Sequence, residues 1–416
     1  MGTIYRQMVI VETNTERLPE KEYILSVIFD QYLGIGWSIK ETGSSKFFRI
    51  LSVENEAELI LPNDFFRNSH RNWLSTDSLP TLPLKVFDAD RLQASIILTD
   101  LSVPILFGQE HMVQIDPDEK KIELPIDILG SAFFLLSRYE ELVIPTRDEH
   151  DRFAASQSIL FKAGIIKRPI IDEYIEILWT SLNLLFPSLK RKERYTTANY
   201  SCDVDRPIFT QLHSLKGTIK KVAKDMLKGE TRSSIASTVG KYIAIKREGD
   251  SADPLFKFSW IMDQLEQNNI RGAFYFITGH TSPLDGDYSI QSQRMHKLLD
   301  QIHRRGHEIG LHTSYNSAQE PMLISEEFDR LKDVCHSLNI EQEKWGGRQH
   351  YLRWVPTKTW TDWDCAGLNY DTTLGYADQI GFRAGTMFDY PVYDLVKRKK
   401  LKLLERPLSI METTLF

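Results

Sequence analysis

The 416-residue sequence has few cysteines and no long hydrophobic run. Its three cysteines, Cys202, Cys335 and Cys365, are far apart and form no CxxC pair, so we expect no disulfide framework. No apolar stretch approaches the length that spans a bilayer, and the first residues lack the apolar core of a signal peptide. Together these absences predict a reducing compartment, with the cytoplasm as the default location.

The chain also lacks an excess of positive charge. Its formal net charge is −6, which argues against a general nucleic-acid-binding protein. The hydrophobic content of 42% and charged content of 26% are those of an ordinary globular protein. Because the length exceeds that of one typical domain, we predict two domains, residues 1–190 and 191–416, divided at the charged segment 189–194.

The first of these domains has the pattern of a small α+β fold. Residues 20–33 and 167–186 show helical periodicity, and glycines or Pro187 follow them. Residues 47–53 and 57–61 alternate apolar and polar side chains around a polar turn, which predicts a β-hairpin. The polar run 137–141 is expected to be a solvated helix end with local ion pairs; the alternative is a structural clamp between the two halves.

The second domain alternates helices and strands. Helical patterns over residues 256–268, 293–305 and 325–338 are separated by apolar strand-like runs at 272–279, at 307–312 and from 345. This alternation predicts a parallel α/β barrel or sheet, in which sites form at the carboxyl ends of the strands. The polar residues expected at these ends are Asp203, Asp205, Thr278, His312, Arg348, His350 and Asp371.

Asp203 and Asp205 stand at the end of the first of these strands. Residues two apart on a strand point to the same side, so both carboxylates can face one site. Two close carboxylates repel each other, and a metal ion or an arginine between them would relieve the repulsion. The alternative is that both are solvated turn residues ahead of Pro207.

Residues 208–252 form a basic stretch with a helical pattern. Lysines and arginines outnumber acidic residues there, and the first interpretation is a solvated helical insertion. The alternative is a face for an anionic membrane or for a phosphate-bearing, lipid-linked substrate. The apolar side of this stretch, with Ile219, Val222 and Met226, is narrow.

Several strings of the C-terminal half resemble the polysaccharide deacetylase family with the NodB homology domain. They are Ser201-Cys-Asp-Val-Asp205, Gly272-Ala-Phe-Tyr-Phe, Gly306-His-Glu-Ile-Gly-Leu-His312-Thr-Ser, Arg348 and Gly367-Leu-Asn-Tyr-Asp371. The resemblance covers about residues 196–416, and the preceding half looks like the accessory region of a bacterial subgroup. It implies a distorted (β/α) barrel preceded by a smaller α+β domain.

The same resemblance implies removal of N-acetyl groups from amino sugars of a bacterial polysaccharide or its precursor. The implied cofactor is one divalent metal ion, zinc first, with cobalt, nickel or manganese as alternatives. Asp203 would be the general base, and Asp205 and His312 would bind the metal. Arg348 would hold the base carboxylate, and Asp371 would help to shape the site.

Two departures from the family pattern define the remaining expectations. The family places a second metal-binding histidine where this chain has Asn316, an amide that we predict as a poorer third ligand. His350, two residues after Arg348, is the candidate for a replacement ligand or a catalytic acid, and His307 is expected to support the loop. The late Leu-x-His of the family is missing, since no histidine follows His350.

These departures leave two main functional hypotheses, with a metal-dependent hydrolase of a different small amide as a third. The first is an active, metal-dependent deacetylase with a carbohydrate substrate, and the second is a catalytically impaired protein of the same fold that binds carbohydrate or regulates. Arg383, near the Asp371 string, could supply a cation for a substrate anion or form a structural ion pair.

Overall fold

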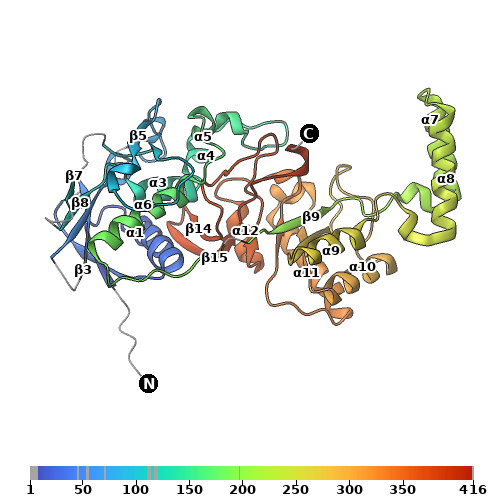
Figure 1. The fold of residues 1–416 in the computed structure, drawn as a ribbon. Coiled ribbons are helices and arrows are strands. Elements are labelled where there is room, and N and C mark those ends of the chain that lie inside the picture. Colours follow the sequence, from blue (N-terminus) through green and yellow to red (C-terminus); the bar gives the residue numbers. More distant parts are fainter. Residues whose placement is uncertain are drawn as a thin grey trace, which may run out of the picture. The chain divides into compact units, whose positions relative to one another are not determined.

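The computed structural model describes residues 8–44, 46–52, 56–69, 72–109, 114–116, 120–195 and 197–414. Figure 1 shows a mixed α/β protein, as the alternating pattern predicted. The chain divides into two compact units, one of residues 1–196 with 351–416 and one of residues 197–350. The first boundary lies close to the predicted division at 190, whereas the second, at 350, was not expected.

The first unit contains a mixed sheet. Its strand order is β2-β1-β3-β4-β8-β7, with β1 parallel to β2 and β4 parallel to β8. The predicted hairpin is confirmed, because β3 and β4 pair antiparallel. The strands are β1 (Met8–Thr13), β2 (Gly36–Glu41), β3 (Phe47–Ser52), β4 (Glu58–Pro62), β7 (Gln114–Asp116) and β8 (Lys121–Glu123), with β5 (Lys85–Asp88) and β6 (Ser102–Ile105) forming a separate pair.

Helices of the first unit supply much of its core. The predicted helix over 20–33 is α1 (Leu18–Leu25) continued by a π-helix, and it ends at Gly34, whose φ of 70° suits a residue without Cβ. The predicted second helix is α6 (Ile170–Leu185), and its apolar stripe is buried. The other elements are α2 (Asp64–Ser69), α3 (Ile128–Leu136), α4 (Tyr139–Val143), α5 (Ile159–Lys162), α12 (Thr359–Ala366), β13 (Tyr370–Asp371), β14 (Tyr390–Asp394) and β15 (Lys399–Glu405).

The polar run between α3 and α4 is buried, so the expectation of a solvated helix end is wrong. Arg138, Glu140, Glu141 and Arg383 are all almost completely excluded from solvent. Arg138 donates to both glutamates, and Arg383 donates to both oxygens of Glu141 at 2.9 and 2.7 Å. The alternative, a structural clamp, describes this cluster, because it ties residues 138–141 to a segment near the end of the chain. Arg383 therefore forms a structural ion pair.

The second unit is built on parallel strands in sequential order. They are β9 (Tyr200–Val204), β10 (Gly272–Ile277), β11 (Glu308–His312) and β12 (Gly346–Arg348), each paired with the next. Helices α9 (Phe258–Gln267), α10 (Gln293–Arg304) and α11 (Pro321–Ser337) connect them. Helix α11 begins one turn earlier than the predicted 325, because Pro321 suits a first helical position. No pairing among the described residues joins β9 back to β12, so a closed barrel is not shown.

The strand register brings the carboxyl ends of these strands together. Asp203 pairs with Tyr275, Ile277 with His312, and His312 with Arg348. The residues predicted at the strand ends of this unit thus lie along one edge of the sheet.

The basic insertion between β9 and α9 is helical, as predicted. It consists of α7 (Leu215–Leu227) and α8 (Arg232–Glu248), which lie side by side in Figure 1. Among the residues with described positions, no helix combines the length and apolar character needed to cross a membrane.

Candidate metal centre

His312 ends β11 with its side chain buried. Its Nδ1 lies 2.8 Å from the backbone oxygen of Arg348, and a carbonyl only accepts hydrogen bonds, so Nδ1 carries the proton. The lone pair is therefore on Nε2, which lies 3.2 Å from Oδ1 of Asp205 and 4.0 Å from Oδ2 of Asp203. Nε2 of His312 is thus available as a metal ligand.

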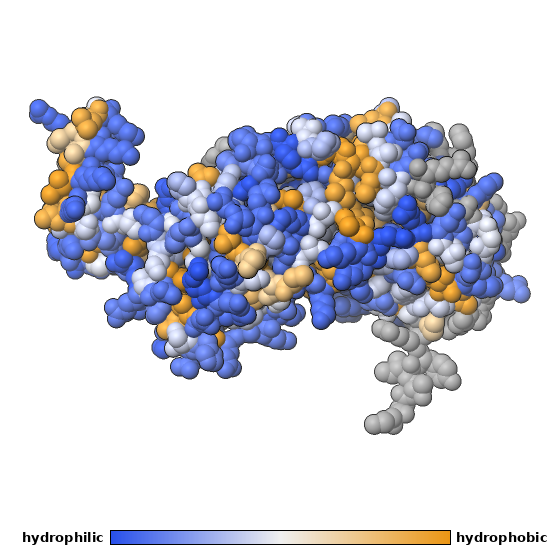
Figure 2. Space-filling view, turned by 180° about the vertical axis from the view of Figure 1, so that it is seen from behind, coloured by the Kyte–Doolittle hydropathy of each residue, from blue (hydrophilic) through white to orange (hydrophobic). Residues whose placement is uncertain are grey.

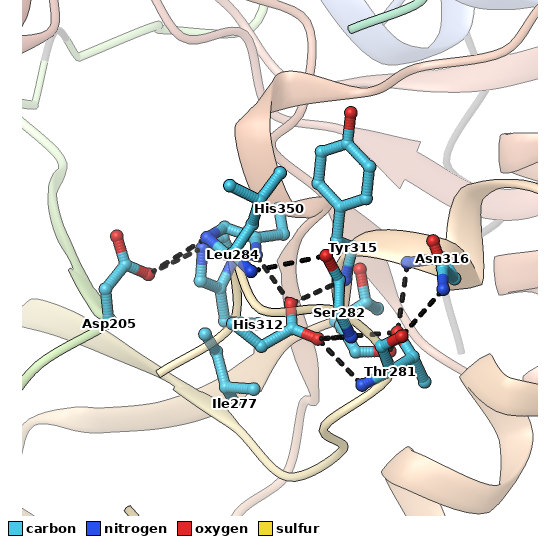
Figure 3. A network of polar contacts seen from close by, with 12 residues as sticks. Asp205, Ile277, Thr281, Ser282, Leu284, His312, Tyr315, Asn316 and His350 are labelled. Atoms are coloured by element: carbon cyan, nitrogen blue, oxygen red, sulfur yellow. Dashed lines mark hydrogen bonds and ion pairs between the residues drawn. The ribbon is translucent and has the colours of Figure 1, made fainter. Parts of the chain in front are cut away.

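His350 follows β12 by two residues and is also buried. Its Nδ1 lies 3.0 Å from Oδ1 of Asp285, and its Nε2 lies 3.5 Å from Oδ1 of Asp205 (Figure 3). This pairing assigns the proton to Nδ1 if Asp285 is ionised. Nε2 of His350 then faces Asp205 with its lone pair, as Nε2 of His312 does.

Asp285 is held as a carboxylate by its surroundings. Burial raises its pKa. The hydrogen bonds with His350 and from the backbone N–H groups of Tyr315, Thr281 and Ser282 outweigh burial and lower the pKa to about 2. A carboxylate that receives the Nδ1 proton of a histidine fixes both the tautomer and the ring orientation. This is the usual outer partner of a metal-binding histidine.

The three donor groups converge. Candidate ligand atoms of Asp205, His312 and His350 all lie within 4.8 Å of one another. Burial lowers the pKa of His312, but the charges of Asp203 and Asp205 outweigh it, so the net pKa is raised. For Asp205, burial raises the pKa, and His312 and His350 reverse this to a net lowering. Two imidazoles and one carboxylate match the ligand set of a zinc-type catalytic site and could hold one metal ion.

Asp203 stands beside this group with a different partner. Its Oδ1 accepts a hydrogen bond of 2.8 Å from Arg348, whose other terminal nitrogen donates to Ser201 at 2.7 Å. The buried guanidinium also lies over the ring of Tyr275, 5.3 Å from its centroid. Arg348 therefore fixes one oxygen of Asp203 and leaves the other turned toward His312.

Asn316 and His307 lie apart from the three converging groups. The amide nitrogen of Asn316 donates to the backbone oxygen of Thr281 at 2.8 Å, and Figure 3 shows Asn316 on the far side of His312 from Asp205. The prediction that Asn316 is a metal ligand is not favoured by this arrangement. The alternative, His350 as the replacement ligand, fits the geometry. His307 accepts from Gly272 N and faces Glu266, so it supports the strands, as expected.

Asp371 belongs to the other compact unit. It is fully buried at the end of β13, and its carboxylate accepts from both the backbone N–H and the hydroxyl of Thr373. Burial and the neighbouring Asp371 raise the pKa of Glu405 well above its usual range. The predicted site-shaping role of Asp371 remains a prediction.

A pocket of about 480 Å³ adjoins the Asp205–His312–His350 group, the candidate metal-binding group. Asp285 contributes to its wall, so an outer partner of the metal group lies at the pocket surface. Sequence reasoning missed Asp285; the available signal was its place in the loop that follows a buried parallel strand. The lining residues are Arg206, Ile208, Phe209, Thr210, Gln211, Lys221, Leu255, Pro283, Asp285 and Asp287.

Comparison with known proteins identifies one family. Residues 9–187 match the model of a family of unknown function, DUF7033. This segment lies within the predicted N-terminal domain and outside the metal-binding group. Searches of curated proteins and of solved structures found no match.

Proposed function

We propose that residues 197–350 hold one divalent metal ion on Asp205, His312 and His350, and that the protein hydrolyses N-acetyl groups of amino sugars. The observation that carries the proposal is the convergence of two imidazole Nε2 atoms on one carboxylate, with both Nδ1 protons fixed by other partners. Zinc is the first candidate because imidazole and carboxylate suit it, and cobalt, nickel and manganese are alternatives.

Hydrolysis of an amide needs a strong nucleophile at neutral pH. A zinc-type ion supplies one when bound, because it lowers the pKa of its water to about 7. Asp203 is the proposed general base: its Oδ2 lies 4.0 Å from Nε2 of His312, within reach of a water molecule beside the group. Arg348 holds one oxygen of this carboxylate through a hydrogen bond and so prevents its rotation away from the site.

The fold of the second unit agrees with this proposal without deciding it. Sequential parallel strands with intervening helices are what a NodB-type (β/α) barrel would contribute from this stretch. The finer assignment to that barrel, and a polysaccharide or its precursor as the substrate, rest on the resemblance of the His312 string. The pocket beside the group is the proposed position of the sugar.

The first test separates metal binding from catalysis. Purified full-length protein, stripped with a chelator, is titrated with zinc, cobalt, nickel and manganese, and acetate release is then measured with N-acetylated oligosaccharides. We expect His312→Ala and His350→Ala to weaken metal binding strongly and Asp203→Asn to keep it but release no acetate. His336→Ala, an exposed histidine of α11, is the control and should behave as the wild type.

Two outcomes would contradict the proposal at different points. If the wild type binds none of the four metals, the proposed metal site is wrong, and so is the proposed enzymatic activity. If Asp203→Asn loses the metal, Asp203 is a metal ligand, and its assignment as the general base is wrong.

A catalytically impaired, carbohydrate-binding or regulatory protein is the second candidate. It is favoured by one observation: the sequence has Asn316 where the family has a histidine. This candidate predicts binding of N-acetylated oligosaccharides without acetate release, whether or not metal is present. Calorimetric titration with the same oligosaccharides distinguishes it from the enzyme.

A further inference from the structure

The two inserted helices α7 and α8 have a small buried interior. Only Thr218 and Asp225 of α7, and Thr238 and Ile245 of α8, are buried. The base of the pair is fixed instead by polar contacts: Asp253 accepts from the backbone of Phe209 and contacts His213, and Asp250 accepts from Arg294 of α10. The helices are therefore anchored at one end, while most of their apolar side chains lie outside their own interface.

An exposed apolar row runs along α7. Leu215, Ile219 and Met226 are spaced by four and seven residues, which places them on one face of a helix. Ile219 is 59% exposed and Met226 is 60% exposed, and Leu227 at the end of α7 is 90% exposed. Figure 2 shows apolar side chains along this helical pair. Val239 and Ile243 form a shorter exposed apolar pair on α8.

Lysines lie next to this apolar row. Within residues 214–248 there are nine lysines and arginines and three acidic residues, a net charge of +6 in a chain whose total is −6. Lysines follow at intervals of four: Lys216 and Lys220 lie beside the apolar row, and the later two turn progressively toward the opposite side of the helix. All four side chains of this series are exposed: Lys216, Lys220, Lys224 and Lys228.

We propose that α7 and α8 dock the protein on the surface of an anionic lipid bilayer. An apolar row beside a row of lysines suits the bilayer interface, where apolar side chains enter the headgroup region and lysines meet anionic lipids. Nucleic acid would account for the lysines but not for exposed Ile219, Met226 and Leu227. A symmetric contact with a second copy would bring two positively charged surfaces together, which opposes association.

The apolar row and the exposed lysines of this surface include none of the residues of the candidate metal site, so the proposal does not depend on the proposed function. The test is co-sedimentation of the full-length protein with vesicles of phosphatidylcholine alone or of phosphatidylcholine with phosphatidylglycerol, at low and high salt. We expect binding to the anionic vesicles at low salt, weaker binding at high salt because salt screens the lysines, and little binding to the neutral vesicles.

Two sets of variants test the two components. Lys216→Glu with Lys220→Glu should weaken binding to the anionic vesicles at least about tenfold, because each lysine near such a surface contributes appreciably. Ile219→Ser, Met226→Ser and Leu227→Ser together should also weaken it at least about tenfold, through the lost apolar insertion. Matched controls in the same unit are Lys297→Glu and Met322→Ser, both exposed, which should bind as the wild type.

Three results would overturn the proposal. They are absence of binding to anionic vesicles at low salt, unchanged binding of the apolar variant, and lipid-free self-association that the apolar variant abolishes. The last would identify a second copy of the chain as the occupant. Circular dichroism establishes that the variants are folded.

Discussion

Two groups of ionisable side chains, one in each compact unit, are built in different ways. In the first unit, Arg138 and Arg383 donate hydrogen bonds to Glu140 and Glu141, so each buried charge faces an opposite one. In the second unit, lone pairs of two imidazoles face the same carboxylate oxygen of Asp205. A balanced set of donors and acceptors stabilises a fold, whereas converging acceptors prepare a cation site.

The first way to test this comparison is to unbalance the Arg138–Arg383 cluster. Glu141→Gln removes the charge that faces both arginines and leaves them buried with Glu140 alone. We expect the free energy of unfolding to fall by about 3–5 kcal/mol, the usual cost of a buried charge without its partner. Urea denaturation of the full-length protein measures this loss, which should be the same with and without added metal.

A surface pair provides the matched control for Glu141→Gln. Glu176 pairs with Arg191 at 2.7 Å, but both side chains are partly exposed. Glu176→Gln should cost less than about 1 kcal/mol, because exposed ion pairs contribute little. If Glu141→Gln costs no more than this control, the cluster does not hold the first unit together as described.

Glu141 and Glu327 are both buried, and their pKa values shift in opposite directions. For Glu141, burial raises the pKa, but Arg383 and Arg138 bring it below its usual value. For Glu327 in α11, burial raises the pKa to about 7, because its hydrogen-bond donors belong to Ser314 rather than to an arginine. Glu327 therefore binds its proton more tightly in the folded state than in the unfolded chain.

The pH dependence of stability follows from this difference. The proton on Glu327 stabilises the fold fully below the ordinary pKa of 4.5, and this stability is lost as the pH rises through about 7. At about 1.4 kcal/mol per pKa unit, the full loss reaches roughly 3–4 kcal/mol. We expect Glu327→Gln to remove this loss, so that urea denaturation at pH 5 and pH 8 differs less than in the wild type. Glu326→Gln, the exposed neighbour, is the control; the same pH trend in both variants would contradict the assignment.

Local sequence patterns predicted the strands and helices that carry the candidate site, but not every residue that contacts the candidate ligands. The spacing of Asp203 and Asp205 on a strand, and the order of strands and helices, predicted that polar residues gather at one sheet edge. Asp285 could not be found in this way, because its contact with His350 joins residues 65 apart through a loop.

Local sequence patterns likewise did not indicate that Arg138 is buried. Its partner Arg383 lies 245 residues away, so the sequence near α3 shows only a polar run that resembles a solvated helix end. Periodicity reports which face of an element is apolar, whereas pairing between distant charges depends on the tertiary arrangement.

A further difference between the two groups is that the candidate metal-binding group has an outer carboxylate, Asp285, that orients His350. Asp285→Asn keeps the size of this side chain but loses the charge that receives the Nδ1 proton of His350. We expect metal affinity to fall about 10–100-fold, the usual effect of removing such a partner. Isothermal titration with zinc measures the affinity, and Asp287→Asn, the same substitution at the same pocket, should leave it unchanged.

A double-mutant cycle separates orientation of His350 from a general effect on the fold. If Asp285 acts through His350, Asp285→Asn will weaken metal binding in the wild type but cause no further loss in His350→Ala, because its only route to the metal has been removed. Additive losses in the double variant would mean that Asp285 supports the loop at Thr281 and Tyr315 rather than the histidine. Asp285 would then stabilise the fold, as the residues of the Arg138–Arg383 cluster do, and would not act as the outer partner of a metal ligand.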